Sequence, residues 1–69
     1  MNREIAGKIK THALVSIENL SSILLVEGVS EDSSIYKKLH REVGILIGET
    51  HVQIVEWMDR LYPELDDTP

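Results

Sequence analysis

Apolar residues recur at steps of three and four residues along two long stretches of the chain, and this spacing constrains the fold more than any other feature. The recurring residues of the first stretch are Ile5, Ile9, Ala13, Ile17, Leu20 and Leu24, and Ala6 and Ile23 fall within the same arc of the helix. Those of the second are Ile35, Leu39, Val43, Leu46, Thr50, Ile54, Trp57 and Leu61. This spacing lines up apolar side chains on one face of a helix. We expect a single all-α domain: a helix over about residues 3–27, a turn at 28–31, a second helix over about 32–62 and an acidic tail at 63–69.

The ends of the two predicted helices carry residues that are typical of helix boundaries. Gly28 suits the left-handed position that follows many helices. Ser30 or Asp32 can cap the start of the second helix, because a short polar side chain accepts a hydrogen bond from a free backbone N–H there. Pro63 is expected to end the second helix. The two helices then form an antiparallel hairpin.

Two glycines in the second stretch argue for an alternative. Gly44 and Gly48 each cost about 1 kcal/mol relative to alanine inside a helix, and Thr50 and Gln53 have the spacing of a capping box that would begin a third helix. A break near Gly48 is therefore the second interpretation. We favour a continuous helix because the apolar spacing keeps its phase through this region.

A hairpin of two helices has one contact seam and cannot enclose a core. The chain has 69 residues and no cysteine, so disulfides cannot supply the missing stability. Further apolar residues lie in lines outside the two stripes, and Gly44 and Gly48 are spaced for a close helix crossing. We expect a homodimer that forms a four-helix bundle. The alternative is that these are ordinary isolated apolar residues on the surface. The predicted interface with the second copy or a partner comprises Leu14, Val15, Leu25, Val26, Gly44, Gly48, Val52 and Val55.

The formal charge of −5 is confined to the last third of the chain. Residues 1–48 sum to zero, and Arg60 is the one basic residue after them. The acidic residues that form the predicted docking surface for a basic partner are Glu49, Glu56, Asp59, Glu64, Asp66 and Asp67. We expect a small protein-binding module, such as an adaptor, regulator, inhibitor or chaperone-like subunit, that is not an enzyme and binds an unidentified protein.

A basic cluster near the start of the second helix raises RNA binding as an alternative function. It consists of Lys37, Lys38 and Arg41. Helical hairpin dimers can present such a cluster on one helix face, but a negatively charged chain is unusual among nucleic-acid-binding domains and makes DNA an improbable ligand. The simpler interpretation is that the cluster pairs with Glu18 and Glu27 across the hairpin. In the same arrangement Arg3, Lys8 and Lys10 face Glu56, Asp59 and Glu64 at the other end.

Few residues suggest catalysis or metal binding. Glu56 and Asp59 have an E-x-x-D spacing that resembles half of the magnesium-binding pattern of all-helical nucleotide pyrophosphohydrolases, which would imply a metal-dependent enzyme. The E-E-x-x-E cluster of that family is absent, so we interpret both carboxylates as surface residues. His40 and His51 lack a ligand four residues on and are expected at the edge of the helix stripe, although a site shared between two subunits stays open. We expect neither a metal nor a cofactor.

The longest uninterrupted apolar run is too short to cross a bilayer, which takes about 20 residues. No apolar segment with a small-residue cleavage site follows the basic residues near the N-terminus, so we expect no signal peptide and a cytoplasmic protein without membrane contact.

Overall fold

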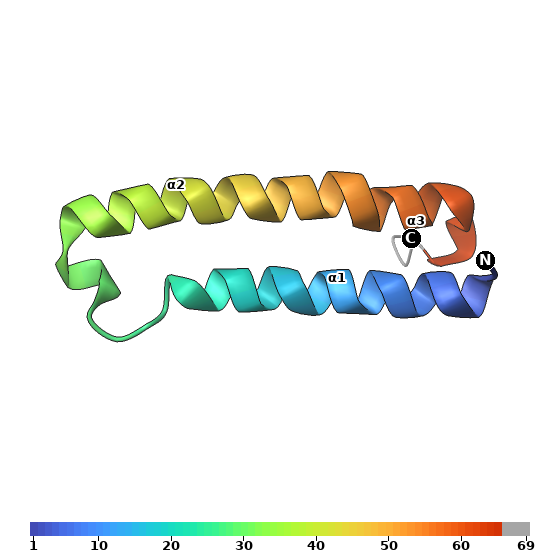
Figure 1. Ribbon diagram of the computed structural model, residues 1–69, viewed down its shortest axis with the longest axis horizontal. Helices are drawn as coiled ribbons and strands as arrows, with labels where there is room; N and C mark the ends of the chain where they lie inside the picture. The colour runs from blue at the N-terminus through green and yellow to red at the C-terminus, as the bar shows by residue number, and fades with distance from the viewer. Residues whose placement is uncertain (66–69) are drawn as a thin grey trace.

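The computed structural model describes residues 1–65, and within this range the chain is helical apart from turns. Its two long helices are α1 (Arg3–Ile23) and α2 (Ser33–Thr50), which lie side by side and antiparallel (Figure 1). The π-helical turn η2 (His51–Val55) and helix α3 (Glu56–Leu61) extend α2 in one rod. Short 3₁₀ turns, η1 (Val29–Glu31) and η3 (Pro63–Leu65), complete the described chain. The predicted all-α fold with two helices is confirmed.

Helix α1 is shorter than its apolar spacing predicts. The side chain of Asn2 caps its start by accepting a hydrogen bond of 2.9 Å from the backbone N–H of Ile5. The helix ends at Ile23, and not near residue 27, because the next three backbone N–H groups bond to carbonyls three residues back and tighten the chain. Gly28 has the expected left-handed conformation, with φ +90°, but it lies in the middle of the connection. The turn is therefore longer than predicted.

Asp32 is the N-cap of α2, as one of the two sequence interpretations proposed. Its carboxylate accepts hydrogen bonds from the backbone N–H of Ile35 at 3.2 Å and from the hydroxyl of Ser34 at 3.0 Å. These bonds favour the ionised form, so the pKa of Asp32 lies below its ordinary value, with the Ile35 N–H as the largest cause. The cap and the turn at Gly28 thus direct α2 back along α1.

The second rod passes through Gly44 and Gly48 without a break, and its irregularity comes later, at η2. There the backbone N–H of Glu56 donates to the carbonyl of His51, five residues back. A π turn accommodates one more residue than an α turn, so the helix beyond it is rotated relative to a regular α-helix. The second rod is therefore continuous, as predicted, but a different face of it packs against α1 after residue 50.

The residues that pack after η2 lie one position later than the 3.6-residue period predicts. Val55 is 3% exposed and Met58 is 1% exposed, whereas Ile54 and Trp57 remain partly exposed. The prediction of an unbroken stripe is wrong beyond Thr50. The prediction that Val55 belongs to a partner interface is also wrong, because the π turn directs its side chain into the hairpin. The buried apolar residues of the described chain are Ala6, Ala13, Val43, Val55 and Met58.

The molecule is elongated, with principal extents of 45 × 24 × 17 Å and a Cα radius of gyration of 14.8 Å. A compact domain of this length would have a radius of gyration of about 11 Å.

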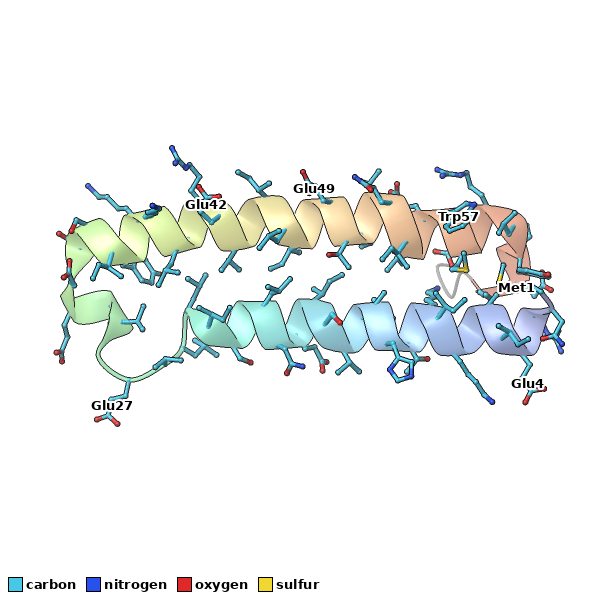
Figure 2. All side chains as sticks on the ribbon, viewed as in Figure 1. Met1, Glu4, Glu27, Glu42, Glu49 and Trp57 are labelled. Carbon is cyan, nitrogen blue, oxygen red and sulfur yellow. The ribbon has the colours of Figure 1, made fainter. Side chains whose placement is uncertain are left out.

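Labelled carboxylates such as Glu4, Glu27, Glu42 and Glu49 point away from the opposite helix (Figure 2). Within residues 1–65, no helix combines the length and the apolarity that crossing a bilayer requires. The hairpin seam itself buries little apolar surface.

Candidate protein-binding surface

Both apolar stripes are wider than the seam of the hairpin, so part of each stripe stays exposed. The edge residues of the two stripes are between 37% and 53% exposed. We name them the front face: Ile5, Ile9, Ile23, Ile35, Leu46, Ile54, Trp57 and Leu61. A helix that packs against one neighbour needs only a narrow apolar seam, whereas a helix in a bundle uses a stripe at least about 100° wide. The front face is thus apolar surface that the hairpin leaves uncovered.

The residues of the front face lie on one side of the hairpin. A shallow groove runs between the two helices on this side, and its lining comes from both: Ile9, His12, Ala13, Ser16, Thr50 and Ile54. Ile5 lies one helical turn before Ile9 and Ile23 lies two turns after Ser16, so both extend the α1 edge of this groove. On the other rod Leu46 precedes Thr50 by one turn, and Trp57 and Leu61 follow Ile54. The front face therefore draws residues from both helices, which meet at this groove.

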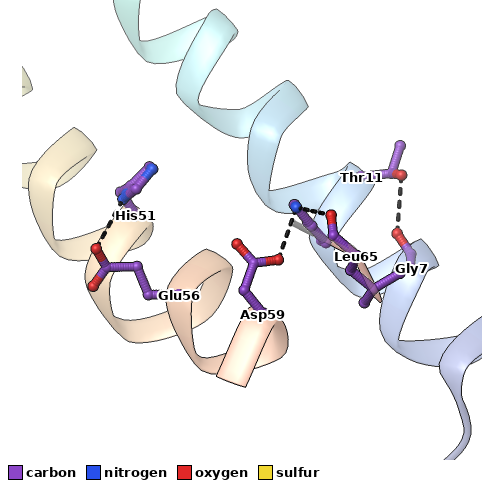
Figure 3. Close-up of polar contacts among 7 residues, drawn as sticks. Gly7, Thr11, His51, Glu56, Asp59 and Leu65 are labelled. Carbon is purple, nitrogen blue, oxygen red and sulfur yellow. Dashed lines mark hydrogen bonds and ion pairs between the residues drawn. The ribbon is translucent and has the colours of Figure 1, made fainter. Parts of the chain in front are cut away.

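Near the N-terminus of α1, a different side of the seam is covered by contacts with α3 and η3. Lys10 forms an ion pair of 2.7 Å with Asp59, and the two side chains are only 15% and 21% exposed (Figure 3). The same ammonium donates to the carbonyl of Leu65, and the hydroxyl of Tyr62 donates to the carbonyl of Met1 at 2.6 Å. These contacts fold η3 back against α1. The front face carries no such cover in the described chain.

This ion pair corrects one of the predicted docking residues. Asp59 does not belong to an acidic docking surface, because the rotation introduced by the π turn directs it toward α1 and Lys10 neutralises it there. The pairing itself was expected from the antiparallel arrangement of the two helices and is confirmed. Glu56 instead faces His51 on its own rod at 3.8 Å, with both side chains about half exposed (Figure 3).

The remaining acidic residues of the predicted docking surface divide into two groups. Glu49, Glu56 and Glu64 are exposed. Asp66 and Asp67 lie outside the described residues. The structure therefore leaves three exposed carboxylates of the predicted set within residues 1–65, spread along the second rod and η3.

The other residues of the sequence-predicted interface lie away from the front face. Leu14, Val15, Leu25, Val26 and Val52 are between 41% and 82% exposed. Leu14 lines a second shallow groove, next to η3, together with residues that include Lys10 and Leu65. These side chains are exposed, but they do not line the groove of the front face.

Gly44 and Gly48 lie on the outer side of α2. They border a shallow depression with Ile45, Glu49, Val52 and Gln53. A Cβ atom added to either glycine would meet nothing within 4 Å. The contact between α1 and α2 therefore does not depend on these glycines, and a close crossing with another helix stays a prediction.

The basic cluster Lys37, Lys38 and Arg41 is exposed on the first turns of α2. Arg41 pairs with its neighbour Glu42 at 3.2 Å, and not with the expected Glu18 or Glu27 of the first helix and turn. The labelled Glu27 points away from α2 in Figure 2. The cluster is thus a solvated surface feature of the hairpin.

The described part of the chain offers no preorganised polar site. No polar or charged residue among residues 1–65 is fully buried, and no group of three or more histidine or carboxylate side chains there could hold a metal ion. His40 lies against the ring of Tyr36, with ring centroids 5.9 Å apart, and His51 lies beside Glu56. Both histidines are exposed.

The front face is the surface that sequence reasoning missed. Its residues were assigned to the stripes, and the stripes were assumed to pack against each other. The width of each stripe was the available signal, because Ile5 and Ile23 lie at one edge of the α1 stripe while Ala6 and Ala13 lie nearer its centre. Comparison of the chain with protein-family models, with curated proteins and with solved structures finds no match.

Proposed function

We propose that this chain is a small helical module that binds another polypeptide through its front face. The observation that supports the proposal is the set of apolar side chains, drawn from both helices and meeting at one groove, that the hairpin leaves about half exposed. Large contiguous apolar patches are uncommon on soluble monomers and are typical of interaction sites. Covering them removes apolar area from water, which favours association by about 25 cal/mol per Å².

The shape of the front face favours a helix, or a pair of helices, as its ligand. Its groove is shallow and follows the helix axes, whereas small-molecule sites are concave and enclose most of their ligand. The lining of the groove combines the apolar side chains of Ile9 and Ile54 with the small side chains of Ala13 and Ser16. Ridges of apolar side chains on another helix can pack into such a groove at interaxial distances of about 8–10 Å.

Site-specific photo-crosslinking tests this function without assuming which polypeptide binds. A benzophenone amino acid replaces Trp57, which lies on the front face and is 49% exposed, in cells that produce the chain. We expect covalent adducts of higher mass after irradiation. The matched control places the same group at Leu25, which is 82% exposed but lies in the connection between the helices.

The adduct pattern decides between the front face and the remaining surface. Adducts at position 57 and few or none at position 25 support the proposal. Equal labelling at both positions would indicate nonspecific contact. An absence of adducts at position 57, repeated with the probe at Ile54, would refute binding through this face. Circular dichroism of each labelled protein verifies that the helices have formed.

A further inference from the structure

We infer that the polypeptide on the front face is a second copy of this chain, so that two hairpins form a four-helix bundle through their front faces. This inference rests on the proposed function and identifies its partner. The eight side chains of the front face, and not the residues outside the stripes that the sequence indicated, form the interface.

The accessible surface of the hairpin supports a partner of this size. The chain exposes 5292 Å², whereas a compact monomer of 7.8 kDa exposes about 4,400 Å². The excess, about 900 Å², is close to the roughly 800 Å² that each partner buries in a protein interface of standard size. A second hairpin can therefore restore the burial that the elongated monomer lacks.

The side chains of the front face also suit contact with their own copy. A two-fold dimer brings identical patches together, so like charges on the patch would repel one another. The lining of the front groove contains no carboxylate, ammonium or guanidinium group. Its polar members are His12, Ser16 and Thr50. No carboxylate, ammonium or guanidinium group in this groove opposes its pairing with itself.

The hairpin geometry determines which side the second copy can use. In a four-helix bundle each helix packs against two neighbours, one of them in its own hairpin and one in the other hairpin. Each apolar stripe has a buried part and an exposed part. Ala13 and Val43 are buried in the hairpin, and Ile9 and Leu46 are exposed beside them. On another side of the seam η3 folds against α1 through Leu65 and Lys10. Within residues 1–65, no segment folds over the front face.

Light scattering combined with size-exclusion chromatography tests the dimer. At micromolar concentrations we expect the unmodified chain to have twice the chain mass of 7.8 kDa. The variant Ile9→Glu plus Ile54→Glu places charges on both edges of the groove and should have the mass of one chain. The matched control is Val15→Glu plus Val52→Glu, which changes two residues of similar exposure away from the front face and should keep the doubled mass.

The remaining outcomes are also decisive. A single-chain mass for the unmodified protein overturns the dimer, and adducts of the position-57 probe with a different protein would then still support the proposed function. A loss of mass in the control variant alone would place the interface on the outer surfaces. If the glutamate variant fails to fold, Ile9→Ala plus Ile54→Ala replaces it, and the dissociation constant of the dimer should rise by more than about tenfold. An unchanged constant would overturn the inference.

Discussion

The ammonium of Lys10 on α1 lies 2.7 Å from the carboxylate of Asp59 on α3, and the two side chains are largely shielded from solvent. The residues are 49 positions apart in the sequence, so the contact exists only in the closed hairpin. Lys10 also holds the carbonyl of Leu65. The side chain of Lys10 thus joins α1 to α3 and to the turn η3 that follows it.

Replacing Asp59 with asparagine should destabilise the fold. The substitution leaves a shielded ammonium without its counter-charge, and hydrogen bonds to charged groups contribute about 1.5–3 kcal/mol. We expect a loss of that size in the free energy of unfolding, measured by urea titration at a fixed protein concentration. Glu56→Gln is the control, because the contact of Glu56 with His51 is exposed, and it should cost less than about 1 kcal/mol. Equal losses in the two variants would contradict this assignment.

Deletion of Gln53 should be tolerated. The π turn His51–Val55 contains one residue more than an α turn, and removing an exposed residue from it allows a regular helix while Val55 and Met58 keep their places in the core. We expect helical circular dichroism and a melting temperature no lower than that of the unmodified chain. Insertion of one alanine after Gln53 should instead rotate α3 by about 100° and lower the melting temperature. The prediction fails if the deletion unfolds the protein and the insertion does not.

Acid should weaken the start of α2 through Asp32. Its pKa is lowered in the folded chain by hydrogen bonds from the Ile35 N–H and the Ser34 hydroxyl. A group whose folded pKa is lowered stabilises the fold above its unfolded pKa, about 3.9 for aspartate, and loses that contribution as the pH falls through the folded value. Asp32→Ala should therefore destabilise the chain at neutral pH, and the difference from the unmodified protein should shrink below about pH 4. Thermal melts across this range measure it, and a difference that is constant with pH would contradict it.

The glycines of this chain should respond to alanine in opposite directions. Gly44→Ala and Gly48→Ala should each stabilise the helix by up to about 1 kcal/mol, because the added methyl group meets open space. Gly28→Ala should destabilise the turn by about 1 kcal/mol, since its φ of +90° is unfavourable for an L-residue. Chemical unfolding measures both effects. If Gly44→Ala also lowered the mass of the assembly, the outer side of α2 would be the self-association surface instead of the front face.

The sequence by itself determined the local structure of this protein. The apolar spacing predicted two helices and a continuous second rod, and Asp32 and Gly28 have the cap and the left-handed conformation expected of them. These features depend on backbone preferences and on hydrogen bonds between residues close in the chain, so the residue types are sufficient to predict them.

Only the tertiary structure decided the register of the second rod and the surface that stays exposed. A π turn is rare and interrupts the 3.6-residue period of the helix that contains it, so the regular period cannot predict it. Its one-residue shift buries Val55 and Met58, brings Asp59 to Lys10 and leaves Trp57 on the front face. Which half of a wide apolar stripe stays uncovered depends on where the neighbouring helix lies, and the stripe alone does not contain that information.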